Sequence, residues 1–140
     1  MFRISQYMEE IAHPTPPGPK RNPPGPVVIW NLIRRCNLTC KHCYSISADK
    51  DFPGELSTAE IYGVMDDLKR FRVPVLILSG GEPLLRPDIF DIAQRAKGLG
   101  FYVGLSSNGT LIDESNIRRI EETDFDYVGI SLDGIRETHD

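Results

Sequence analysis

Three cysteines, Cys36, Cys40 and Cys43, lie within eight residues, and the chain of 140 residues contains no others. Thiolates in such a cluster are ligands for iron–sulfur centres, and a cubane cluster usually takes four of them, one for each iron. Three thiolates would leave one iron without a protein ligand. We expect a second molecule to bind at that open position, and the chemistry to take place there.

A zinc site is the alternative interpretation of these cysteines, with His42, His13 or a more distant residue as the fourth ligand. Structural zinc sites usually combine two pairs of ligands, whereas this sequence offers a single group. His42 also lies between two cysteines, where its side chain cannot easily join them on one metal. The iron–sulfur interpretation is therefore favoured over a zinc-binding module. A simple electron-transfer module is a further non-enzymatic alternative.

The segment Gly80-Gly81-Glu82-Pro83 is a second candidate for ligand binding. Paired glycines allow the backbone to approach a ligand closely. Their carbonyls and the Glu82 carboxylate could accept hydrogen bonds from an ammonium group. The alternative is a tight turn that Pro83 stiffens.

Polar side chains also occur in two later loops. Ser106, Ser107 and Asn108 offer hydroxyl and amide groups suited to ribose hydroxyls or a carboxylate, although Asn-Gly is also an ordinary turn pair. Ser131 and Asp133 form either a ligand contact or a turn. Two arginines directly before Cys36 either balance the charge of a cluster, meet an acidic substrate, or form solvated surface.

Short apolar runs alternate with helical patterns along the chain, which predicts parallel βαβ units. Runs that are apolar on both faces suit a parallel sheet covered by helices. Ser57 and Glu60 form a capping box that begins the first helix, Pro87 and Asp88 open the second, and Asp113 caps the third. The predicted strands occupy residues 27–33, 75–78, 101–105 and 127–131.

The four polar loops each follow one of these strands. In a β/α barrel the carboxyl ends of the strands lie on one face, where active sites are built, so we expect the loops to converge. Four strands cannot close a barrel, and the sequence ends at what reads as the start of a further helix. We therefore expect an α/β fold: the N-terminal part of a longer barrel, incomplete at its C-terminus.

Composition limits the function classes. The formal net charge is −4 and no basic stripe is present, which argues against nucleic-acid binding. No apolar run is long enough for a membrane span, and the N-terminus lacks a signal-peptide pattern, so we expect a cytoplasmic protein with no membrane partner. Residues 1–26 are an N-terminal segment with a proline-rich arm, and residues 27–140 form the core domain.

The C-x3-C-x2-C motif followed by Gly-Gly-Glu-Pro in a β/α repeat resembles the radical S-adenosylmethionine (radical SAM) superfamily. This resemblance runs from about Val27 to the end of the chain and implies a partial (β/α)6 TIM-like barrel. It implies a 4Fe-4S cluster whose open iron binds the amino and carboxylate groups of SAM. Reductive cleavage of SAM then gives a 5′-deoxyadenosyl radical, which abstracts hydrogen from the substrate.

The same resemblance assigns roles to residues of this chain. It makes Cys36, Cys40 and Cys43 the cluster ligands. The residues from Gly80 to Pro83 would bind the methionine amino group, and His42 would border the adenine. The candidate SAM-binding residues are His42, Gly80, Gly81, Glu82, Pro83, Ser107, Asn108, Ser131 and Asp133.

Segments 26–44 and 51–56 are also similar to the radical SAM enzymes of haem d1 biosynthesis. This closer resemblance implies removal of propionate side chains from a tetrapyrrole, 12,18-didecarboxysirohaem, with a ferredoxin or flavodoxin as electron donor. Haem synthesis from sirohaem and maturation of peptide-derived cofactors are the alternatives. Relatives of this kind carry a cysteine-rich C-terminal region for a further cluster, and no residue after Cys43 could supply a thiolate here.

Overall fold

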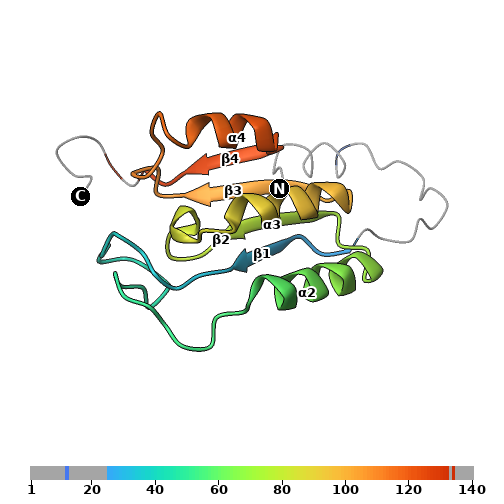
Figure 1. Cartoon of the computed structure of the whole chain (residues 1–140), viewed down its shortest axis with the longest axis horizontal. Helices are drawn as coiled ribbons and strands as arrows, with labels where there is room; N and C mark the ends of the chain where they lie inside the picture. The colour runs from blue at the N-terminus through green and yellow to red at the C-terminus, as the bar shows by residue number, and fades with distance from the viewer. Residues whose placement is uncertain (1–11, 13–24, 133, 135–140) are drawn as a thin grey trace.

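The computed structural model describes residues 12, 25–132 and 134. Its centre is a parallel four-stranded sheet in which the strands pair in chain order (Figure 1). The strands are β1 (Val28–Asn31), β2 (Val75–Ser79), β3 (Tyr102–Ser107) and β4 (Tyr127–Ile130). The helices are α2 (Thr58–Arg70), the short 3-10 helix η1 (Pro83–Leu85), α3 (Ile89–Gly98) and α4 (Ile117–Thr123).

The predicted alternation of strands and helices is therefore confirmed as an α/β fold. The first strand is shorter than predicted, since β1 ends at Asn31 and the chain then turns into the cysteine loop. The predicted proline-rich arm and the candidate Asp133 lie outside the described residues, apart from the arm's last two residues, 25 and 26. The division of the chain into residues 1–26 and 27–140 stays a prediction.

A local sequence signal accounts for the start of α2. In the capping box of α2, the Ser57 hydroxyl accepts from the Glu60 N–H (3.4 Å), and the Glu60 carboxylate accepts from the Ser57 N–H (2.8 Å). The predicted cap of α4 is wrong. The helix begins after Asn116, because the Asp113 carboxylate accepts from the Ser115 N–H (2.8 Å) and so closes a turn before the helix.

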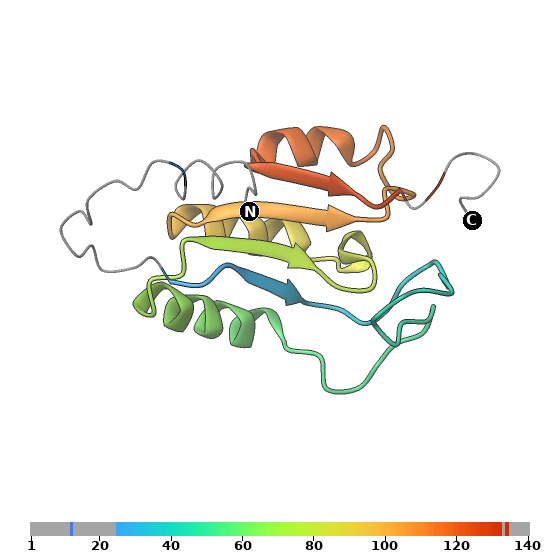
Figure 2. The ribbon, with the colours of Figure 1, turned by 180° about the vertical axis from the view of Figure 1, so that it is seen from behind.

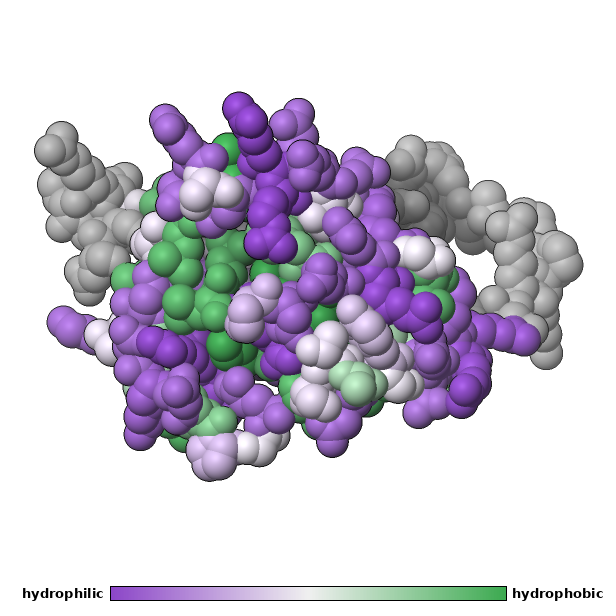
Figure 3. Space-filling view, in the orientation of Figure 1, coloured by the Kyte–Doolittle hydropathy of each residue, from purple (hydrophilic) through white to green (hydrophobic). Residues whose placement is uncertain are grey.

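All three α-helices pack on one face of the sheet, and hydrophilic side chains cover much of their outer surface (Figures 1 and 3). The core lies between these helices and the sheet. It is made of apolar side chains and includes two phenylalanine rings. Its buried members are Leu32, Ile61, Met65, Val73, Leu76, Leu78, Ile89, Phe90, Ile92, Ala93, Ala96, Phe101, Val103, Leu105 and Ile120.

The opposite face of the sheet carries none of the helices α2, α3 and α4 (Figure 2). Ile29, Tyr102 and Tyr127 point to this face and are 66%, 47% and 54% exposed. The expectation that helices would cover the apolar strands is therefore confirmed for the face on which α2, α3 and α4 pack. Strands of a barrel have this character, because their second face points to the interior rather than to helices.

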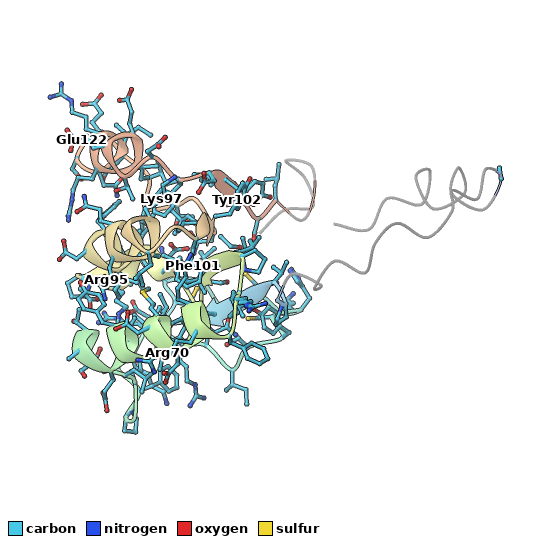
Figure 4. The ribbon with its side chains drawn as sticks, turned by 90° about the vertical axis from the view of Figure 1, so that its right-hand side faces the viewer. Arg70, Arg95, Lys97, Phe101, Tyr102 and Glu122 are labelled. Carbon is cyan, nitrogen blue, oxygen red and sulfur yellow. The ribbon has the colours of Figure 1, made fainter. Side chains whose placement is uncertain are left out.

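The two ends of the sheet differ in character. Figure 4 views the molecule from the end where the strands begin, and Lys97 and Tyr102 lie there. The Asp126 carboxylate accepts from the Val103 N–H (2.7 Å) and lies 3.0 Å from the Lys97 ammonium. The Tyr102 hydroxyl donates to the Asp126 carbonyl (3.0 Å). These contacts hold β3 and β4 together at the end away from the cysteines.

Candidate functional site

A cavity of about 290 Å³ lies at the carboxyl ends of the strands. All four strand arrows point toward this end, where the cysteine loop extends beyond β1 (Figure 1). Residues from all four predicted loops line the cavity, which confirms their convergence. The lining residues are Cys36, Leu38, Cys40, His42, Cys43, Tyr44, Ser79, Gly80, Gly81, Ser106, Ser107, Asn108 and Ser131.

The three cysteines are free thiols that differ in exposure. Cys36 is buried, Cys40 is half-buried and Cys43 is exposed. The Leu38 N–H donates to the Cys36 sulfur (3.4 Å), and the Cys43 N–H donates to the Cys40 carbonyl (3.2 Å). The loop therefore presents three thiols to one cavity while its backbone is held by its own turns.

The two arginines before Cys36 contact the segment 49–52, which follows the cysteine loop. The Arg35 guanidinium pairs with Asp49 (2.8 Å) and Asp51 (3.1 Å), and the hydrogen bond that it donates to Asp49 raises the pKa of Arg35 above its ordinary value. Arg34 stacks on the Phe52 ring, 4.3 Å from the ring centroid. Neither arginine lines the cavity. Both side chains reach solvent, as the surface alternative expected. Their contacts also position the loop, which the sequence did not indicate.

Gly80 and Gly81 pack directly against the chain that leads into the cysteine loop. A Cβ atom would lie 2.4 Å from the Ile33 oxygen at Gly80, and 2.3 Å from the Arg35 oxygen at Gly81. The Gly81 N–H also donates to the Ile33 carbonyl (2.7 Å). Both positions therefore require glycine for close packing. Contact of their carbonyls with a ligand stays a prediction.

Glu82 lies behind the cavity wall. It is 0% exposed, and its carboxylate accepts from the Leu84 N–H (3.0 Å), the Ser107 hydroxyl (2.9 Å) and the Asn108 N–H (2.8 Å). Neither Glu82 nor Pro83 lines the cavity. The carboxylate therefore joins the loop after β2 to the loop after β3. Its contact with an ammonium group stays a prediction.

Strand alternation separates the two serines that end β3. Ser107 lies on the helix-covered face and bonds to Glu82. Ser106 lies on the other face, level with Gly129 of β4, and it lines the cavity together with Ser79. Sequence reasoning did not single out Ser79. It named Ser106, Ser107 and Asn108 together for contacts with a ribose or a carboxylate, and both serines line the cavity. The period of two along a strand was the signal that would have placed the two serines on opposite faces of the sheet.

The remaining candidates lie where the cavity opens. His42 and Ser131 line it, and Ser131 is exposed. The Ser131 N–H donates to the Ser107 carbonyl (3.0 Å), which extends the pairing of β3 and β4 into the loops. Sequence reasoning also missed two residues that line the cavity, Leu38 and Tyr44. The Tyr44 hydroxyl donates to the Asn31 side chain (3.2 Å).

The donor set around the cavity consists of three soft thiols. A cubane cluster takes one thiolate per iron, so the chemistry of these donors fits an iron–sulfur cluster. Within the described part of the chain, no group of three His, Cys, Asp or Glu side chains is arranged to hold one metal ion.

None of the helices in the described residues is long and apolar enough to cross a bilayer.

Comparison with known proteins agrees with this site. The radical SAM superfamily model matches residues 30–140. The chain is 58% identical over its whole length to pre-heme d1 synthase of Dinoroseobacter shibae, covering 35% of that protein. Over 82% of its length it is 50% identical to Fe-coproporphyrin III synthase of Methanosarcina barkeri, covering 29% of that protein. The chain thus spans about a third of the length of these curated relatives.

A solved structure shares the fold. The crystal structure of Streptococcus suis SuiB bound to S-adenosylmethionine superposes with a TM-score of 0.66, over 81% of this chain and 26% of that one, at 20% identity. The match of the family model covers most of the chain, including all three cysteines. The chain therefore belongs to the radical SAM superfamily, whose enzymes use a 4Fe-4S cluster and S-adenosylmethionine.

Proposed function

We propose that Cys36, Cys40 and Cys43 hold the 4Fe-4S cluster, and that the protein carrying this chain acts on a tetrapyrrole in haem d1 biosynthesis. The observation that carries the proposal is that all three thiols line one cavity at the carboxyl ends of the strands. The substrate class rests on 58% identity to a pre-heme d1 synthase over the whole chain.

The protein's own residues would bind and orient the ligands. The three thiolates would bind three irons and leave the fourth iron open to SAM. The carbonyls of Gly80 and Gly81 would accept from the methionine ammonium group, while the hydroxyls of Ser106 and Ser131 would face the ribose and carboxylate. The chemistry that a bound cluster would supply is one-electron reductive cleavage of SAM. The walls of the cavity would shield that chemistry from water.

The finer proposal concerns the substrate and its surroundings. The substrate would be 12,18-didecarboxysirohaem, which would lose its propionate side chains. A ferredoxin or flavodoxin would supply the electrons. The protein would work in the cytoplasm, because an odd, clustered set of cysteines suits a reducing compartment. Similarity to an Fe-coproporphyrin III synthase supports a tetrapyrrole in general, so that a related sirohaem-derived substrate is the second candidate.

The first experiment tests the cluster. The complete protein is reconstituted anaerobically with iron and sulfide, and its EPR spectrum is recorded with and without SAM. We expect a reduced-cluster signal that SAM changes, and formation of 5′-deoxyadenosine. Cys36→Ala, Cys40→Ala and Cys43→Ala should each abolish SAM cleavage, whereas Thr39→Ala, an exposed change in the same loop, should retain it. Uptake of zinc without any cluster would refute the proposal.

The second experiment tests the substrate. The reconstituted protein is offered 12,18-didecarboxysirohaem, sirohaem and Fe-coproporphyrin III in separate reactions with SAM and reductant. Mass spectrometry should detect loss of the propionate groups from the first compound only. Turnover of one of the other two tetrapyrroles would reassign the substrate. Failure with all three, together with continued production of 5′-deoxyadenosine, would contradict the tetrapyrrole proposal and leave the cluster assignment standing.

A further inference from the structure

A closed ring of hydrogen bonds joins the cysteine loop to the loop after β3. The Asn37 amide donates to the Thr110 hydroxyl (2.8 Å), and that hydroxyl donates to the Asn108 side-chain oxygen (2.7 Å). The Asn108 amide in turn donates to the Asn37 side-chain oxygen (3.0 Å). Each side chain both donates and accepts, so that the three bonds polarise one another and fix all three groups.

The ring also fixes which end of the Asn108 amide meets the cysteines. Its oxygen accepts from both the N–H (2.9 Å) and the hydroxyl of Thr110. The amide nitrogen must therefore occupy the other side, where it lies 3.8 Å from the Cys36 sulfur. The Leu38 N–H reaches the same sulfur at 3.4 Å. Cys36 thus receives two N–H donors, one from its own loop and one from a loop 72 residues away.

We propose that Asn37, Asn108 and Thr110 form a positioning ring that holds the Asn108 amide against the Cys36 sulfur. The ring thereby raises the reduction potential of the cluster and slows the loss of iron from it. The inference rests on the proposed function, since it takes Cys36 as a cluster ligand. Hydrogen bonds to ligand sulfurs withdraw negative charge and so favour the reduced cluster, which carries the extra electron.

This role differs from the one that the sequence predicts for Asn108. A ribose or carboxylate contact would need the Asn108 side chain to be available to a ligand. Instead its oxygen has two donors and its nitrogen faces Asn37 and Cys36. Asn108 is therefore a positioning residue, and it acts on the cluster through Cys36.

Thr110→Val is the sharpest test, because it removes the hydroxyl that joins Asn37 to Asn108 and changes the side-chain volume little. Thr110 is also distant from Cys36 in the sequence. The complete, reconstituted protein is titrated with reductant in the absence of SAM, and the reduced cluster is followed by EPR. We expect the reduced-to-oxidised ratio at a fixed potential to fall about tenfold, equivalent to about 59 mV for a one-electron couple. Thr110→Ser keeps the hydroxyl and should preserve the wild-type midpoint.

Cluster retention gives an independent reading. Iron release to a chelator should be faster from Thr110→Val than from Thr110→Ser, because only the serine variant keeps the ring closed. An unchanged midpoint in Thr110→Val, or equal iron release from both variants, would overturn the inference while the proposed function stood. If the wild-type protein bound no cluster at all, the proposed function and this inference would fail together.

Discussion

Replacing Glu82 by glutamine tests whether this residue supports the site or binds its ligand. The two side chains have nearly the same shape, but an amide presents a nitrogen where the second carboxylate oxygen was. The Glu82 carboxylate accepts three hydrogen bonds, from Leu84, Ser107 and Asn108, at 2.8 to 3.0 Å, and it is 0% exposed. Whichever way the new amide turns, its NH₂ group must face at least one backbone N–H.

The magnitude follows from that mismatch. The smallest loss leaves the oxygen with Leu84 and Ser107 and sets the NH₂ group against the Asn108 N–H. One hydrogen bond to a charged acceptor is then lost, which is worth about 1.5–3 kcal/mol. If the loops open locally, that loss makes exchange of the protected amides about ten- to a hundredfold faster.

Hydrogen–deuterium exchange of the complete protein, read from peptides that cover residues 82–86 and 106–110, measures this opening. Glu122→Gln, an exposed change on α4 (Figure 4), is the matched control and should leave exchange in these peptides unchanged. If Glu82→Gln left both peptides protected as in the wild type but weakened SAM binding, the carboxylate would be a ligand contact, and the structural assignment would be refuted.

Three further predictions concern stability. Arg86 is buried, lies 2.8 Å from Asp88 and donates to the carbonyls of Leu32 and Leu56. Arg86→Met should therefore lower the free energy of unfolding by about 3–5 kcal/mol. An unchanged melting temperature would contradict this. Gly81→Ala should prevent assembly of the cysteine loop and reduce iron uptake, whereas Gly63→Ala, with open space around its Cβ, should stabilise α2 by about 0.5–1 kcal/mol. The hydrogen bond from the Val103 N–H, with help from Lys97, lowers the pKa of Asp126. This carboxylate therefore stabilises the fold above its unfolded pKa of about 3.9, and that stabilisation is lost as the pH falls through the lower folded value. Asp126→Asn should flatten the acid limb of the stability curve, and an unaltered acid limb would speak against it.

The sequence was sufficient for features that depend on near neighbours. The capping box of α2 lies within four residues, and the apolar runs of the strands are contiguous, so both could be predicted. The order of loops along the chain, combined with the geometry of parallel strands, also placed the four loops at one end. Even locally, competition between turns misled the prediction at Asp113, whose carboxylate bonds to Ser115 instead of capping α4.

Features that depend on distant partners could not be predicted in this way. Glu82 becomes a buried support because Ser107 and Asn108 lie 25 and 26 residues further along the chain. The glycine pair is needed where another segment of backbone approaches, and only the folded structure shows that segment to be Ile33 to Arg35. A motif marks which residues matter, but pairing between strands decides whether each one faces the ligand or the scaffold.

The graded exposure of the three cysteines has a practical consequence for handling the protein. Thiol reactivity depends on access as well as on thiolate content, so an alkylating reagent or an oxidant will reach Cys43 first, Cys40 next and buried Cys36 last when no cluster is bound. A sample damaged in air would keep an intact Cys36 while losing its capacity to take up iron. Peptide mapping of each thiol, rather than a total thiol titration, therefore distinguishes intact protein from protein in which Cys43 and Cys40 have already reacted.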